Sequence, residues 1–261
     1  WEKKIPSAEQ FAWVQSTSWE RLKGEMKGMY ESEGELDSEG FDPQVIDWWD
    51  VKRWMSHSIT SLNIVGKGVL TGRLTLYDGY AYIQIVDEVV QIDKYEIISM
   101  TTGGNEESAY WTGSFSLGLT VSSGNTKKEE YSSTLNIKRQ TALRRFQINA
   151  LANYGKTYGL ETERNLRENP SIDTFLTRRF FFRPGFLEYF SDVFQNVKQK
   201  ATYGLGAGYD IYSSPRTKWT LFAGPAYQTT TFDAVLVGQN KTEETPALIL
   251  TSDYDIELTK N

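Results

Sequence analysis

From Trp111 onward, apolar and polar residues alternate along the chain over unusually long stretches. In "WTGSFSLGLTVS", residues 111–122, every second position is Trp, Gly, Phe, Leu, Leu or Val, and the positions between them are Thr, Ser or Gly. A period of two indicates a β-strand with one apolar face and one polar face. The alternation lasts about a dozen residues, whereas strands of globular proteins usually have ~5–6. It therefore predicts strands that cross something apolar and broad.

The same alternation returns in "FQINALANYG", "ATYGLGAGYDIY" and "LILTSDYDIEL". Connections predicted to be long are "SSGNTKKEE", "KTYGLETERNLRENP" and "TFDAVLVGQNKTEETP", and those predicted to be short are "QTALR", "RPGF" and "SSPRTK". Outer-membrane barrels have short periplasmic turns and longer external loops. The pattern thus predicts an antiparallel transmembrane β-barrel with eight visible strands, at residues 111–122, 130–139, 145–155, 172–183, 187–195, 200–212, 217–229 and 247–259.

Aromatic residues near the predicted strand ends supply the two girdles that such a barrel needs at the membrane surfaces. The alternative is a soluble lipocalin-like barrel, whose strands also alternate but whose apolar face usually points inward. The girdle candidates are Trp111, Tyr131, Tyr154, Tyr189, Tyr212, Trp219 and Tyr227.

Residues 1–104 predict a different β structure, with short strands and tight turns. Two segments, about 19–55 and 68–100, each open with Leu-x-Gly and a charged residue and close with an acidic residue and a hydrophobe. We interpret them as two similar units of a periplasmic module, built as small β-barrels or a curled sheet, ahead of the barrel at 105–261. Trp48, Trp49 and Trp54 are core candidates, and they are partner-binding candidates if their rings are exposed.

Composition and charge exclude several classes of function. The 261 residues have a formal charge of −6 and no cysteine, which argues against nucleic-acid binding and excludes disulfides, a thiolate nucleophile and Cys-ligated metals. No stretch approaches the ~18–20 apolar residues of a transmembrane helix. The opening "WEKKIPSAEQF" has neither an initiator Met nor an apolar signal core, so we expect a removed signal peptide or a late start.

Catalytic chemistry has little support in the sequence. The one histidine, His57, lies in the N-terminal part, far from any serine of the predicted barrel rim, so a lipid-modifying enzyme has no base there. The acidic run from Glu31 to Asp42 does not have the spacing of a calcium loop, and we interpret it as a solvated turn. We expect no enzyme activity, no cofactor and no metal site.

Charged residues at polar positions of the predicted strands are candidates for the barrel lumen. Arg144-Arg145 and Arg178-Arg179 would each send one guanidinium inward, to pair with acids such as Asp173. Because a buried charge must be paired, a plugged interior is the default and an anion-selective pore is the alternative. The lumen candidates are Arg178, Arg179, Asp210 and Asp253.

An ordered series of segments also carries a family likeness. "YWTGSFSLGLTVSSGNT", "RRFQINALANYG", "FLTRRFFFRPGFLEYFSDVFQNV", "TYGLGAGYDIY" and "WTLFAGPAYQTTTF" resemble the YdiY-like salt-induced outer-membrane protein family, domain of unknown function 481 (DUF481). The leading "FAWVQSTSWERLKGEMKGMYESEGELDS" resembles the periplasmic extension of its longer members. The resemblance implies a β-barrel in the outer membrane of a Gram-negative bacterium, without catalytic residues.

One departure from the family pattern concerns the end of the chain. Such barrels usually finish on an aromatic residue, whereas this chain stops at "ELTKN". We therefore expect the barrel to be incomplete at the C-terminus, with ten to twelve strands in the full protein.

Two functions remain open. The first is a non-enzymatic structural role, in which the barrel anchors in outer-membrane lipid and the periplasmic module contacts other envelope proteins. The alternative is a small passive channel linked to osmotic or salt stress, as the family label suggests.

Overall fold

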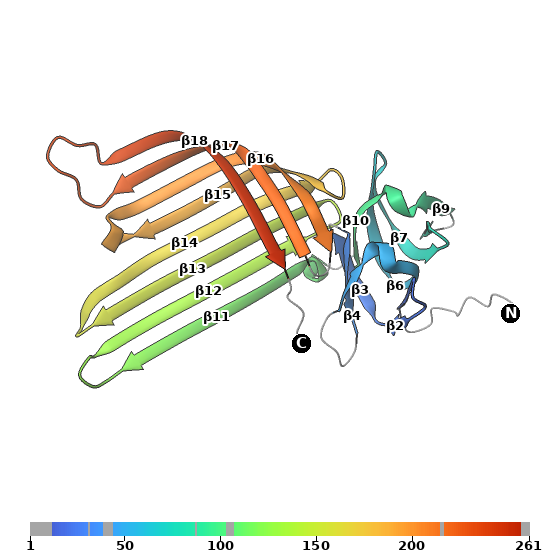
Figure 1. Ribbon diagram of the computed structural model, residues 1–261, viewed down its shortest axis with the longest axis horizontal. Helices are drawn as coiled ribbons and strands as arrows, with labels where there is room; N and C mark the ends of the chain where they lie inside the picture. Colours follow the sequence, from blue (N-terminus) through green and yellow to red (C-terminus); the bar gives the residue numbers. More distant parts are fainter. Residues whose placement is uncertain are drawn as a thin grey trace.

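The computed structural model describes residues 12–30, 32–38, 44–86, 88–102, 107–214 and 217–256, and its regular elements are β-strands and four short 3-10 helices. The strands form two antiparallel sheets, one of ten strands and one of eight. Figure 1 shows the two sheets meeting at one end of the longer strands. The predicted all-β, antiparallel class is confirmed.

The ten-stranded sheet is called the module below. Its path runs β5-β4-β3-β10-β6-β7-β8-β9, and β1 lies between β2 and β6. Its elements are β1 (Trp13–Ser16), β2 (Arg21–Lys23), β3 (Glu25–Tyr30), β4 (Glu33–Asp37), β5 (Gln44–Asp47), η1 (Trp48–Asp50), β6 (Val51–Ile64), β7 (Gly68–Tyr77), β8 (Tyr80–Ile85), β9 (Glu88–Asp93), η2 (Lys94–Glu96) and β10 (Ile97–Thr102).

The same order of elements occurs twice in the module: three strands, a 3-10 turn and a fourth strand. In each turn an aspartate side chain accepts a hydrogen bond from the backbone N–H two residues later, Asp47 at 2.9 Å and Asp93 at 2.8 Å, which is a favourable start for a helical turn. The fourth strands are exchanged, since β6 pairs with β7 and β10 pairs with β3. The two units are therefore interleaved in one sheet.

This sheet encloses one hydrophobic core. The alternation along β3, β6, β7 and β8 sends every second side chain inward, and full burial of each large apolar side chain contributes roughly 1.5–3 kcal/mol. Core residues with 0% exposure are Met26, Met29, Leu36, Trp48, Trp54, Leu62, Leu74, Ala81, Ile83, Ile97 and Met100.

The second sheet, called the C-terminal sheet, contains eight long strands that pair in sequence order. It is curled, and within the described residues its edge strands β11 and β18 each pair with one neighbour (Figure 1). Its strands are β11 (Trp111–Ser122), β12 (Lys128–Gln140), β13 (Arg144–Thr157), β14 (Leu160–Phe175), β15 (Phe180–Asp192), β16 (Val197–Ser214), β17 (Thr217–Phe232) and β18 (Thr242–Ile256), with η3 (Glu107–Tyr110) before β11 and η4 (Val193–Gln195) after β15.

The number of predicted visible strands agrees with the structure, but the positions of the fourth and fifth were wrong. The chain reverses at Tyr158 (φ 53°) and Gly159 (φ 79°), a two-residue hairpin turn that needs a positive φ at both positions. Most of "KTYGLETERNLRENP", which was expected to be a loop, therefore forms β14. "RPGF", expected to be a turn, lies inside β15, where the pairing shifts between Arg183 and Phe186.

Candidate functional site at the junction of the sheets

The module packs against the end of the C-terminal sheet where the turns at 141–143 and 176–179 lie. Two buried side chains of the module donate hydrogen bonds to the backbone there: Asn63 Nδ2 to the carbonyl oxygen of Phe175 at 3.3 Å, and Ser99 Oγ to that of Ala142. Both side chains are at most 3% exposed. These polar groups are thus satisfied across the contact, which we call the junction.

Arg178 extends from the C-terminal sheet across the junction and contacts the module. From the tip of the β14–β15 turn it donates to the carbonyl oxygens of Ile97 (2.6 Å), Lys94 (3.2 Å) and Tyr95. Its guanidinium lies 4.4 Å from the ring centroid of Trp49, a cation–π contact. Burial lowers the pKa of Arg178 from its ordinary value, and the three carbonyls compensate the buried charge.

An aromatic cluster fills the space behind the junction. Phe175, Phe181, Phe186 and Phe222 point to the inner face of the C-terminal sheet, and Ile98 of the module packs on them. The Tyr30 ring of the module lies 5.9 Å from that of Phe175. Glycines on the inner face of β16 leave space for these rings. A Cβ at Gly208 would overlap the Phe181 ring, and one at Gly206 would overlap Phe222.

Beside this cluster lies a buried ion triad. Asp173 is 0% exposed and accepts hydrogen bonds from Arg145 (2.9 Å) and Arg183 (2.6 Å). Both guanidinium groups also stack on Phe181, at 5.8 and 5.7 Å from its centroid. Of the expected pairings, Arg145 with Asp173 is present. Arg183 was missed because it falls in the segment expected to be a turn.

The lumen candidates occupy different places. Arg178 was expected in the lumen and instead enters the junction, because the turn that carries it faces the module. Arg179 is exposed on the same turn. Asp210 is 1% exposed on the inner face and accepts a hydrogen bond from Thr220 Oγ1 at 2.7 Å. Asp253 is exposed and pairs across the ladder with Thr220, so it shares the inner face.

The three tryptophans proposed for partner binding differ in their exposure. Trp48 and Trp54 are 0% exposed and belong to the module core, so they offer no surface to a partner. Trp49 is 39% exposed and stacks near Tyr95, with ring centroids 5.2 Å apart. Trp49 alone of the three remains available for contact, at the border of the junction.

The Lys94 side chain contacts the rings of Trp48 and Trp49 and lies next to the junction. It is 7% exposed, and its Nζ donates to the Val51 carbonyl oxygen at 2.6 Å and lies 5.0 Å from the Trp48 ring centroid. Burial, with a further contribution from the charge of Arg178, lowers the pKa of Lys94 from 10.5 to about 8.

This lowered pKa predicts how stability changes with pH. The unfolded chain keeps the Lys94 proton up to pH 10.5, whereas the folded protein loses it above about 8. The unfolded state therefore binds more protons between these values, and the free energy of unfolding rises with pH in that window. Chemical denaturation from pH 7.5 to 10.5 measures this slope. Lys94→Met should have a smaller slope than the wild-type chain, and equal slopes would contradict the assignment.

Aromatic residues form two rows on the outer face of the C-terminal sheet. Near the junction, the ring centroids of Trp111 and Phe146 are 6.4 Å apart and those of Trp219 and Tyr254 6.2 Å. Nearer the far end, Tyr131 and Tyr154 are 6.1 Å apart, and Tyr203 and Tyr227 5.8 Å. Phe146 and Tyr154 lie on β13, and Trp219 and Tyr227 on β17; each pair spans about 27 Å of strand at ~3.4 Å per residue.

Apolar side chains fill the outer face between the aromatic rows. Phe115 (67%), Leu117 (70%), Leu248 (80%) and Leu250 (75%) are all largely exposed. An exposed apolar surface of this continuity marks contact with another apolar phase or with a partner.

Candidate metal and acidic sites gain no support from the geometry. Within the described ranges, no group of three or more His, Asp or Glu side chains could hold a metal ion. Glu33, Glu35 and Asp37 of the acidic run lie on β4, and Glu31, Glu39 and Asp42 lie outside the described residues. Among the described residues, no helix combines the length and apolar character that crossing a membrane requires.

Comparison with known proteins identifies one family. Residues 115–261 match the family described as "Protein of unknown function, DUF481". The match covers β12 to β18 and most of β11, and it leaves the module outside. Neither the curated proteins nor the solved structures contain a match to the chain.

Proposed function

Since the chain belongs to the DUF481 family, a family of unknown function, we propose from its own geometry that it is a non-enzymatic protein of the bacterial outer membrane. The family and the antiparallel β fold are compatible with an outer-membrane β protein. In this proposal the C-terminal sheet lies in the membrane and holds the module at the periplasmic surface, where the module contacts other envelope proteins.

The outer face of the C-terminal sheet supports a membrane location. Its band between the two aromatic rows is uncharged except at Glu168, and its aromatic borders resemble those of the ~25 Å lipid-facing band of outer-membrane barrels. Tyr and Trp suit those borders because their rings are apolar and their tips are polar.

The junction is the observation that carries the anchoring role. Asn63 and Ser99 of the module donate to the backbone of the C-terminal sheet, and Arg178 of that sheet donates to the backbone of the module. Ile98 continues the aromatic cluster into the module. A module held this firmly has a defined position relative to the membrane, which is what an anchored docking surface requires.

The experiment is the native mass and composition of the full chain extracted from its own membranes in mild detergent. The anchoring role predicts a discrete assembly with a stoichiometric partner that Trp49→Ala weakens. A lone monomer would contradict the role and favour the channel.

Arg178 gives a direct test of the rigid junction. Arg178→Ala should broaden the distance distribution between two spin labels, one on the module and one on the C-terminal sheet, because three charged hydrogen bonds are lost. Since the chain has no cysteine, labels can be placed at Val69→Cys and Leu160→Cys, both at exposed residues. Arg179→Ala, on the same turn, is the matched control and should leave the distribution narrow. Equal broadening would show that Arg178 does not hold the junction.

A passive channel is the second candidate, and a polar cavity on the inner face favours it. This cavity of about 700 Å³ is lined by residues such as Asn165, Arg167, Glu188 and Lys200. The aromatic cluster and the ion triad lie between it and the junction. We therefore expect no steady conductance of the wild-type chain in planar bilayers, and an open, anion-preferring current would support the channel instead.

A further inference from the structure

One charged residue lies in the middle of the outer apolar band, Glu168 on β14. It is paired across the ladders with Ala150 on β13 and Tyr189 on β15, so its side chain shares their outer face. Along β14 it is equally far from Arg164 and Ile172, which pair with Tyr154 and Phe146 of the two aromatic rows. The other outer positions between the rows on the described strands are uncharged.

Glu168 has no partner within the described part of the chain. No described side chain or backbone group donates a hydrogen bond to its carboxylate or forms an ion pair with it. The nearest outer cation along the strand, Arg164, is engaged with Glu161 at 2.5 Å. A charged group at mid-height of a membrane is costly, and such groups pair with a neighbouring segment or line a functional site.

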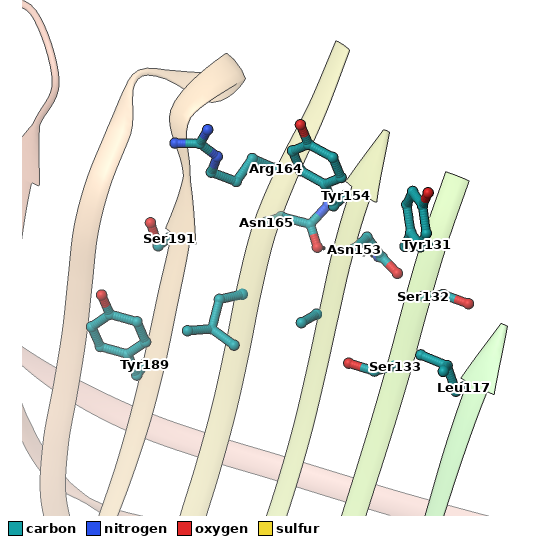
Figure 2. Close-up of a pocket in the computed structure, with 12 residues that line it drawn as sticks. Leu117, Tyr131, Ser132, Ser133, Asn153, Tyr154, Arg164, Asn165, Tyr189 and Ser191 are labelled. Carbon is teal, nitrogen blue, oxygen red and sulfur yellow. Dashed lines mark hydrogen bonds between the residues drawn. The ribbon is translucent and has the colours of Figure 1, made fainter. Parts of the chain in front are cut away.

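A groove of about 430 Å³, shown in Figure 2, is lined mainly by residues of this outer face, among them Leu117, Tyr154 and Tyr189. The small residues Ser133 and Ala152 line the groove, and the rings of Tyr131, Tyr154 and Tyr189 stand around it in Figure 2. Leu166 and Tyr189 line the groove and are the outer neighbours of Glu168. Small residues and serine hydroxyls at a membrane-facing surface allow another segment to approach closely and to form hydrogen bonds.

We propose that the outer face of β12–β15 is the packing site for a membrane-spanning segment of another protein. This inference rests on the proposed membrane location. The segment would fill the groove and give the Glu168 carboxylate a cation or hydroxyl at mid-height, which is the chemistry that an unpaired carboxylate requires. A lipid chain would fill the groove but would supply no donor.

A second copy of this chain does not fit this chemistry. Two copies in one membrane with the same orientation would be related by an axis along the membrane normal. In a two-fold contact through the groove face of both copies, Glu168 lies at the same depth in each and would meet Glu168. Two unpaired carboxylates in contact repel each other.

Photo-crosslinking in native membranes tests the proposal. With no native cysteine, a benzophenone maleimide can be attached to Ala152→Cys in the groove or to Ala223→Cys on the outer face of β17, the matched control. The Ala152 probe should attach to one protein, at a membrane-spanning segment containing Lys, Arg, His, Ser or Thr near mid-depth. Glu168→Leu should lower this yield about tenfold, the loss expected for one charged hydrogen bond, whereas Glu188→Gln on the inner face should not.

The other outcomes are decisive as well. Attachment to lipid from both positions, unaffected by Glu168→Leu, would overturn the packing site and leave the membrane location intact. A crosslink between two copies through Ala152 would overturn the choice of partner. Reaction of both cysteines with a water-soluble maleimide in intact membranes would overturn the proposed membrane location itself.

Discussion

Asp173→Asn is expected to lower the free energy of unfolding of the C-terminal sheet by about 3–5 kcal/mol. The substitution keeps the shape of the side chain but removes the one negative charge between Arg145 and Arg183. Both guanidinium groups are largely buried, at 15% and 21% side-chain exposure. They would be left as two like charges next to the aromatic cluster, without the carboxylate that compensates their burial.

Urea titration of the full chain in lipid vesicles, followed by tryptophan fluorescence, measures this effect. Asp253→Asn is the matched control, because Asp253 is on the same inner face but is exposed. It should change the unfolding free energy by less than ~0.5 kcal/mol. Equal effects of the two substitutions would mean that the triad contributes nothing specific.

Trp54→Ala is expected to destabilise the module by about 3–5 kcal/mol, the usual effect of removing a fully buried aromatic ring. Trp54 is 0% exposed in the centre of the core. Trp49→Ala, five residues earlier, removes a ring that is 39% exposed, and we expect about 1 kcal/mol or less for module stability. The two variants thus separate a core role from a surface role in the same tryptophan cluster.

A conservative variant refines this test. The Trp54 Nε1 group is buried and donates no hydrogen bond within the described residues. Trp54→Phe therefore removes an unsatisfied donor together with part of the ring, and it should destabilise the module less than Trp54→Ala. Thermal unfolding followed by near-ultraviolet circular dichroism compares the variants. If Trp49→Ala unfolds the module as readily as Trp54→Ala, the division of roles is wrong.

Much of the C-terminal sheet could be predicted from the period of two alone. β11, β12 and β13 were placed within two residues of their observed ends because one face is apolar and the other polar or small. β14 was missed because charged residues occupy both of its faces, as Glu168 beside Arg167 illustrates, so no alternation remains to be detected. The usable signal was the turn, where Gly159 permits the positive φ that a two-residue hairpin needs.

The junction could not be predicted from local pattern. Arg178 and Arg179 are adjacent in sequence and equally basic, yet Arg178 bonds to residues more than 80 positions earlier. Which of the two reaches the module depends on how the β14–β15 turn is oriented against β10. The glycines at 204, 206 and 208 are a signal that can be read from the sequence, since three residues without side chains on one strand face indicate that large neighbours crowd that face.

The exchange of fourth strands in the module has a consequence for how the protein is made. β10, the last strand of the module, lies between β3 and β6, so the sheet has a gap at its centre until the chain has been synthesised as far as Thr102. A chain ending before Ile97 would expose two strand edges that normally pair, and such edges recruit other chains. The two units of the module therefore cannot fold one after the other, and both must be present before either is complete.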